Sequence, residues 1–467
     1  MALADQYSKY TIRTAEISAE FKELTKICLP IVATNLVSYL KGMFSVAFMG
    51  RLGPLELAGG SLAVGLTNIT GLSILSGLSL SLDPICSQAS GSNNPSLAIS
   101  ALRRTILLLL IVSIPISALW FSLHSILISL FRLDPAVAAI AHSYVLFSLP
   151  SLLTSSILLP LRSYLRSLSR PLPFAAASTF SSLALHLPLA PFLSSSHLGI
   201  SGIALSSSVS DFATLLLLAA YFSLTQNQNF NPSPSPLHVD GLAYLPLKPQ
   251  PPPPRLPPSP SNTWSPLLRL SIHSCLAVCL EWWWYELVMT IAAGYLIQPQ
   301  SSLAASGIVI QTTALLYTLP VTLSAAVSVR VGHQLGAGRP GLYPSRLPAR
   351  ALRGPRSAGS CGPAFSHQIA LFFTVGCGVL RGCARPAVGA AINLYSFYFV
   401  GAPAALLLAF GYGMGFIGLC FGLLAAQVVC AVSIFAAIWS IDWDQEAQKA
   451  NDLVGLNDAA NTVGVVL

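Results

Sequence analysis

Charged residues are scarce in this sequence. Of 467 residues, 24 are Lys or Arg and 16 are Asp or Glu, which is 9% of the chain, whereas soluble globular proteins carry about 25%. So few charges cannot cover the surface of soluble domains of this length. Hydrophobic residues make up 54%, and the mean hydropathy is +0.68. The composition excludes a disordered chain and a secreted disulfide scaffold, argues against a soluble enzyme, and predicts a polytopic membrane protein.

Several motifs are missing as well. The nine cysteines form no C-x-x-C pair, and Cys275 and Cys279, which share a helix face, favour packing over a metal site. The sequence has no G-x-x-x-x-G-K-[ST] loop, so ATP is not expected to drive the protein. No apolar signal-peptide core is found in the first 26 residues, so we expect the first span to be an uncleaved anchor. We expect no metal and no cofactor.

Long uncharged windows locate the membrane spans. A helix needs about 20 apolar residues to cross the hydrocarbon core, and the windows range from 26 residues after Glu56 to 56 residues after Arg385. They predict ten clear spans, six before residue 225 and four after residue 265. Such long runs favour helices over barrel strands. The predicted fold is therefore an all-α polytopic membrane protein.

Basic residues gather in alternate loops, which predicts the orientation. The loops on one face hold only Arg51 and Arg132. The segments on the other face contain Lys9, Arg13, Lys22, Lys26, Arg103, Arg104, Arg162, Arg166, Arg170, Lys248, Arg255 and Arg269. The positive-inside rule places this second face, with the N-terminus and the central linker, in the cytoplasm. The net charge of +8 follows mainly from this bias and requires no nucleic-acid partner.

The sequence predicts that the chain is a tandem duplication. Residues 231–260 contain 12 prolines, which favour an extended spacer, although a ligand for a proline-reading module is an alternative. Two motifs recur in order on both sides of it. They are Gly91-x-x-x-Pro95 with Gly336-x-x-x-Pro340, and Leu165-Arg166-x-x-x-Arg170-Pro171 with Leu380-Arg381-x-x-x-Arg385-Pro386. The predicted parts are a cytoplasmic tail 1–26, a lobe 27–227, a proline-rich cytoplasmic linker 228–261, a lobe 262–441 and a cytoplasmic tail 442–467.

One segment of the second half breaks the repeat. Residues 341–368 contain four prolines and four arginines and cannot cross a bilayer. A long cytoplasmic loop is one explanation. Our preferred hypothesis is that span nine and part of span ten are replaced by out-of-frame or mis-spliced residues over 341–376. The predicted architecture is then two six-helix lobes, the second incomplete, with 10 or 11 spans in total.

Ionisable side chains within spans are the candidate functional residues, because they are costly in a bilayer and usually face a cavity or a partner. Glu281 is the main candidate, since a carboxyl group that can be neutral or charged is what proton coupling requires; a Glu satisfied by a helix neighbour is the alternative. Glu286 lies five residues further on, at a different angle. Lys41 is expected to be internal, either paired or snorkelling, and Asp211 in span six is a further candidate. Asp83 either gates or caps the cytoplasmic end or is solvated there.

Aromatic and histidine side chains are secondary candidates. Trp283 belongs to three consecutive tryptophans that could stack on a substrate. Three successive residues cover most of a helix circumference, so at least one must face lipid or packing, and an interfacial aromatic belt is the competing account. His142, His186 and His273 are expected to be satisfied core histidines.

The motifs together resemble the multidrug and toxic compound extrusion (MATE) transporter family and its plant DETOXIFICATION branch. The segment Met49-Gly50-Arg51-Leu52-Gly53 is similar to a motif at the end of the family's first span. Further similarity lies in Asp83-Pro84-Ile85-Cys86-Ser87-Gln88, Cys279-Leu280-Glu281-Trp282-Trp283-Trp284-Tyr285-Glu286, Arg330-Val331-Gly332 with Leu335-Gly336, and Gly378-Val379-Leu380-Arg381-Gly382.

The resemblance implies two six-helix lobes around a central cavity and export of organic solutes, xenobiotics or secondary metabolites, by proton-coupled antiport with alternating access. It implies that Glu281 belongs to the second-lobe coupling site, and that the partners are a small organic solute, protons and the lipid bilayer. Bacterial members carry an Asp near Ser45, which this chain lacks. Plant members carry polar residues in span ten that fall within 341–376 here. We expect a monomer that is not an enzyme, in the plasma membrane, the vacuolar membrane or another endomembrane.

Two other hypotheses compete with this one. A truncated or mis-spliced family member would have no transport activity. A membrane-embedded enzyme would need a nucleophile with its base or a metal-ligand cluster, and the sequence offers neither.

Overall fold

Helices form the regular structure of the described part of the chain. The computed structural model describes residues 2–129, 134–195, 198–226, 264–289, 292, 295–296, 299–338 and 375–455. The predicted linker 228–261 lies outside these ranges, and so does most of the anomalous segment 341–376. The all-α fold class is confirmed.

The first half contains six spans, as predicted. Eight described helices are long and apolar enough to cross a membrane, and α7 with α8, bent by 45°, make a ninth if the pair is counted as one broken span. Six of the nine precede residue 226. The helices of this half are α1 (Ala2–Leu52), α2 (Pro54–Thr67), η1 (Asn68–Leu72), α3 (Ser73–Ser79), α4 (Leu82–Gly91), α5 (Pro95–Phe121), α6 (Leu123–Ser129), α7 (Pro135–Phe147), α8 (Leu149–Ser167), α9 (Leu172–Ser181), η2 (Ser182–His186), α10 (Leu187–Ser195) and α11 (Gly199–Gln226).

The described part of the second half contains three such spans and one further long helix. The further helix is α12, continued by the π-helical turn η3, which is less apolar because it carries Arg269, Glu281 and Glu286. The elements of this half are α12 (Trp264–Trp283), η3 (Trp284–Met289), α14 (Pro299–Gly336), α17 (Pro386–Asn393), η5 (Leu394–Gly401), α18 (Ala402–Leu406), η6 (Leu407–Gly411), α19 (Phe416–Trp439) and α20 (Trp443–Val454). Residues 375–382 are also helical.

The internal repeat is visible in the backbone. In both copies of the Leu-Arg-x-x-x-Arg-Pro motif, the helix ends at a residue with φ 56°, and the next N–H donates to the leucine carbonyl at 2.9 Å. These residues are Leu165, Ser169 and Arg170 in the first copy and Leu380, Ala384 and Arg385 in the second. Such a turn satisfies carbonyls that a helix end leaves unpaired. The two motifs are therefore one structural unit used twice.

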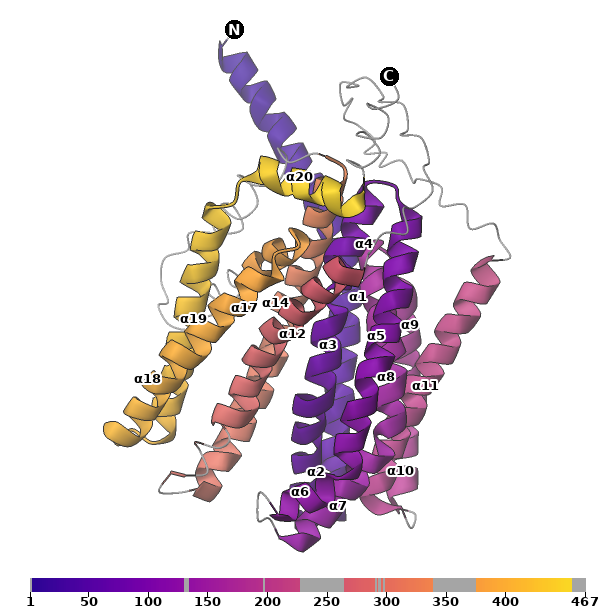
Figure 1. Ribbon diagram of the computed structural model, residues 1–467, viewed down its shortest axis with the longest axis vertical. Helices are drawn as coiled ribbons and strands as arrows, with labels where there is room; N and C mark the ends of the chain where they lie inside the picture. Colours follow the sequence, from indigo (N-terminus) through magenta and orange to yellow (C-terminus); the bar gives the residue numbers. More distant parts are fainter. Residues whose placement is uncertain are drawn as a thin grey trace.

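The two halves pack against each other along α3 and α4. Helix α14 lies against α4, the most extensive helix contact among the described elements, and α12 lies against α3. Two glycines make the first contact close: Gly332 lies on Ser87, and Gly336 lies on the backbone of Gln88. The halves approach most closely at the end where α4 and α20 lie and diverge toward the other end (Figure 1).

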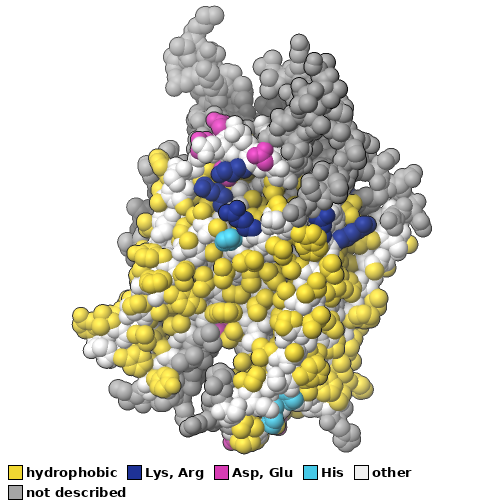
Figure 2. Space-filling view, viewed as in Figure 1, with side chains coloured by type: hydrophobic (Ala, Val, Ile, Leu, Met, Phe, Trp, Pro, Cys, Tyr) yellow, Lys and Arg dark blue, Asp and Glu magenta, His cyan; other side chains and the backbone are white. Residues whose placement is uncertain are grey.

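The surface is apolar between the two ends. Hydrophobic side chains cover the middle of the visible face, while Lys and Arg gather near one end (Figure 2). This is the end where α4 and α20 lie (Figure 1), and we call it the basic end. Arg166 and Arg381 lie beside Asp83 of α4 there, and Arg385 lies beside Glu446 of α20. One large buried apolar cluster lies within the first half, around Met49 and Trp120, and another joins the second half, around Trp284 and Phe397, to Ile27 and Ile31 of α1. This distribution is that of a protein surrounded by lipid.

Helix α20 lies across the basic end (Figure 1). The Asp442 carboxylate accepts hydrogen bonds from the backbone N–H groups of Asp444 and Gln445 at 3.1 and 3.3 Å and caps the helix. Its inner face packs on α4 and α14. The buried Glu446 accepts a bond from Lys449 at 2.8 Å and lies 3.8 Å from Arg385.

We expect Gly336→Ala to lower the thermal unfolding midpoint of the purified protein. A Cβ at this position would overlap the Gln88 backbone, so α4 and α14 would have to separate, which typically costs about 1–3 kcal/mol. The matched control is Gly389→Ala in α17, where a Cβ meets nothing within 4 Å. The control should unfold at or above the native midpoint, because Ala favours a helix over Gly. Equal midpoints for the two variants would contradict this account of the contact.

Candidate functional site

Glu281 lies in the last turn of α12, just before the helix changes to the π-helical turn η3. The Tyr317 hydroxyl, on α14, is hydrogen-bonded to its carboxyl group. Arg381 and Cys377, from the helix at 375–382, lie within electrostatic range. The surroundings of this carboxyl group therefore come from the second half: the hydroxyl of Tyr317, the thiol of Cys377 and the guanidinium group of Arg381.

The three consecutive tryptophans point in different directions. Trp284 is fully buried and packs on Phe397, with ring centroids 5.9 Å apart. Trp283 turns toward the first half, where its indole N–H donates to the carbonyl of Ile69 at 3.2 Å. Trp282 is 40% exposed on the apolar surface. One ring thus serves packing, one joins the halves and one faces outward.

Glu286 faces the first half, unlike Glu281. Its side chain is hydrogen-bonded to Asn68 at the start of η1, and its carboxylate lies beside Gly65 of α2. The change from α12 to the π-helical turn between the two glutamates alters their relative angle. The structure therefore does not bring the two predicted acidic residues into one site.

Lys41 is paired inside the first half. Its ammonium group lies 2.7 Å from the Asp211 carboxylate on α11, which also accepts a hydrogen bond from Ser151 at 2.5 Å. On the next turn of α1, Ser45 lies 3.1 Å from the buried ring of His186. The other ring nitrogen of His186 lies 3.1 Å from the Ser206 hydroxyl. Sequence reasoning singled out Lys41 but did not identify Asp211 as its partner.

Asp83 lies at the contact between the halves. Its side chain is fully buried, and both carboxylate oxygens accept from Arg166, at 2.7 and 2.6 Å. Arg381, from the second half, lies 3.9 Å from the same carboxylate. Beside it, the Gln88 amide donates to the carbonyl of Gly382 at 2.9 Å. Simple solvation of Asp83, one of the sequence-based alternatives, is wrong because the side chain has no contact with water.

The two arginines at Asp83 occupy equivalent positions in the repeat. Arg166 and Arg381 are the arginines of the two Leu-Arg-x-x-x-Arg-Pro motifs. The spacing of 245 residues between Gly91 and Gly336 assigns Ser328 as the counterpart of Asp83. One acid therefore meets the arginines of both halves. The recurring motif carried the signal for this pairing, but sequence reasoning used these arginines for the repeat, the orientation and the family resemblance and did not pair them with Asp83.

The other motif residues form two groups. Gln88, Gly332 and Gly336 belong to the α4–α14 contact at the basic end, and Pro84 is buried on α4 close to it. Gly50, Arg51 and Gly53 lie where α1 meets α2. Arg51 stacks over the Phe48 ring at 5.6 Å, and Gly53 has φ 153° and leads directly into Pro54, the first residue of α2.

Comparisons with known proteins find relatives over almost the whole chain. The MatE family model matches residues 30–192 and 274–344. Protein DETOXIFICATION 55 of Arabidopsis thaliana is 43% identical over 98% of this chain and 96% of its own length. Protein DETOXIFICATION 51 of the same plant is 39% identical over 96% of this chain and 86% of its own length. This coverage gives no support to the hypothesis of a truncated family member.

Solved structures show the same fold. A crystal structure of the eukaryotic MATE transporter AtDTX14 superposes with a TM-score of 0.76 at 28% identity, covering 93% of this chain and 99% of that one. An outward-facing multidrug resistance MATE family transporter superposes with a TM-score of 0.67 at 15% identity, over 92% of this chain and 96% of its own, and shares the fold. The sequence relatives and the architecture place this chain in the multidrug and toxic compound extrusion (MATE) family of membrane transporters.

Proposed function

We propose that this chain exports small organic solutes in exchange for protons by alternating access. The observation that carries the proposal is the position of Glu281, a carboxyl group held by Tyr317 between helices of the second half. Such a group can accept a proton without breaking an ion pair to its hydrogen-bond partner, since a phenol donates to a carboxylate and accepts from a carboxylic acid. Ionisable side chains in this setting mark proton pathways in transporters.

The solute site is proposed to lie between the halves, where Trp283 is half-buried and Glu286 faces the first half. Aromatic side chains there suit xenobiotics or secondary metabolites with ring systems. Lys41, paired with Asp211 at 2.7 Å, is proposed to hold α1 against α11 while the cavity changes shape. Both halves belong to one chain, so we propose that a monomer is the transport unit.

The basic end is proposed to face the cytoplasm. The positive-inside rule supports this orientation, because Arg103, Arg104, Arg269 and Arg385 lie at that end. The divergence of the helices toward the other end then corresponds to a conformation closed on the cytoplasmic side (Figure 1). Asp83 and its two arginines are proposed to be the closure that must separate when this side opens.

Replacing Glu281 with Gln tests the coupling role. In proteoliposomes with an imposed pH gradient, we expect Glu281→Gln to reduce proton-driven transport of a fluorescent organic cation such as ethidium by about a hundredfold or more, a loss typical of removing a positioned proton-transfer group. The remaining transport should no longer depend on pH. Glu286→Gln is the comparison: it removes a carboxylate from the proposed solute site, so we expect it to change the apparent affinity for the cation while transport stays dependent on pH. Unchanged, pH-dependent transport in Glu281→Gln would remove this residue from the mechanism.

Replacing Asp83 with Asn tests the closure. The variant leaves Arg166 buried without its carboxylate, which typically costs about 3–5 kcal/mol, so we expect a lower unfolding midpoint. Combining Asp83→Asn with Arg166→Gln should recover part of the loss, because the uncompensated charge is removed. A native midpoint for Asp83→Asn would show that the ion pairs do not hold the halves together.

Labelling from one side of the membrane tests the orientation. In a variant whose native cysteines are replaced, we expect a cysteine at Ser96, at the basic end, to react with an impermeant maleimide only from the cytoplasmic side. A cysteine at Ser122, at the opposite end of α5, should react only from the other side. Both residues are exposed. The reverse pattern would overturn the proposed orientation.

A further inference from the structure

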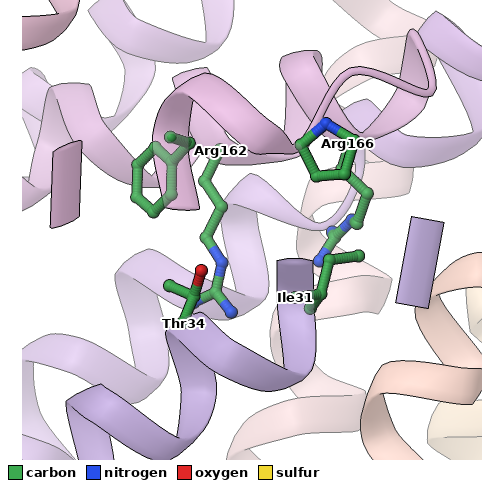
Figure 3. Close-up of a pocket in the computed structure, with 6 residues that line it drawn as sticks. Ile31, Thr34, Arg162 and Arg166 are labelled. Carbon is green, nitrogen blue, oxygen red and sulfur yellow. The ribbon is translucent and has the colours of Figure 1, made fainter. Parts of the chain in front are cut away.

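A small pocket lies at the basic end of the first half, between α1, α8 and α9. Two arginines of α8 extend into it toward Ile31 and Thr34 of α1 (Figure 3). The lining residues are Ile31, Thr34, Arg162, Arg166, Pro171 and Phe174. The cavity volume is about 10 Å³, which corresponds to roughly one water-sized particle.

Positive charge exceeds negative charge around this pocket. Asp83 is bound by Arg166 and faces Arg381 as well, and it is the carboxylate that acts electrostatically on Arg162. Arg162 itself donates to the amide oxygen of Asn35 and lies over the Phe174 ring at 5.9 Å. Both of these partners are neutral. Among the described residues, Arg162 and Arg166 thus share the carboxylate of Asp83, and Arg381, which also lies within electrostatic range of Glu281, approaches the same carboxylate.

One of these guanidinium groups also has an unused donor. Arg166 is 7% exposed, and its Nε–H is buried without a hydrogen-bond partner among the described residues. Buried donors are rarely left unpaired, because the group has lost its water and gained nothing in exchange. Arg166 lines the pocket, so an acceptor placed there could satisfy this donor.

We propose that the pocket binds one small monovalent anion of the size of chloride. The arginines supply both the charge and the donors, since the Thr34 hydroxyl already donates to the carbonyl of Pro30 at 2.8 Å. The volume is too small for a phosphate or a carboxylate-bearing solute. The apolar walls formed by Ile31, Pro171 and Phe174 favour a weakly hydrated ion, because such an ion loses little on leaving water.

The bound anion would act on the contact between the halves. Arg166 links the pocket directly to Asp83, whose carboxylate also faces Arg381 of the second half. Neutralising part of the excess charge lowers the repulsion among the three arginines. The anion therefore stabilises the arrangement in which the basic end is closed, and a site of this kind lies outside both the solute pathway and the proton site at Glu281.

Thermal unfolding in two salts tests the proposal. With purified protein in detergent at constant ionic strength, replacing sodium gluconate by sodium chloride or bromide should raise the unfolding midpoint with saturation. Arg162→Gln should weaken the apparent halide affinity by about tenfold or more, as expected for one lost charge-assisted hydrogen bond. Arg162→Lys should retain part of it. The matched control, Arg269→Gln, removes an exposed basic residue of the same end and should leave the halide effect unchanged.

Bromide provides a second measurement that does not depend on a variant folding. Crystals of the native protein grown in bromide should show an anomalous peak between Arg162 and Arg166. An equal effect of gluconate and halide, a full halide effect in Arg162→Gln, or no bromine peak at the pocket would each overturn the proposal. In the last case the pocket holds water only.

Discussion

The contact between the halves at the basic end is built around one buried carboxylate. Asp83 has no exposed surface, and it accepts two hydrogen bonds from Arg166 while Arg381 approaches from the opposite half. Burying a lone carboxylate is costly, and the cost is offset only when charged donors surround it. The close approach of α4 and α14, allowed by Gly332 and Gly336, brings the second arginine within range. Electrostatics and packing therefore depend on each other at this contact.

The duplication explains why this acid has two arginines. Each half contributes a helix that ends in the same turn, with an arginine in the last helical residues before it. The first half has Asp83 beside that arginine, whereas the second half has Ser328 at the corresponding position. Arg381 consequently lacks an acidic partner of its own in the equivalent place and meets the acid of the other half. Because only one of the two equivalent positions holds an acid, that acid contacts the arginines of both halves and links them.

Much of the architecture could be predicted from composition and spacing. The scarcity of charge and the long uncharged windows predicted six spans before residue 225, and the structure contains them. The paired motifs predicted the repeat, because helix-ending turns leave a local signature.

The intramembrane residues were identified individually, but their partners were not. The pairing of Lys41 with Asp211 depends on residues 170 positions apart, and the opposite directions of Glu281 and Glu286 depend on the change to a π-helical turn. No local sequence pattern predicts either this ion pair or the different directions of the two glutamates.

The position of α20 has a consequence for any opening of the basic end. This helix packs on α4 of the first half and on α14 of the second, and the Asn94 amide, after α4, donates to the carbonyl of Val454 at 3.4 Å. A rigid helix seated on two bodies cannot stay in contact with both once they move apart. Any motion that separates α4 from α14 would therefore have to break the contacts of α20 with one of these two helices.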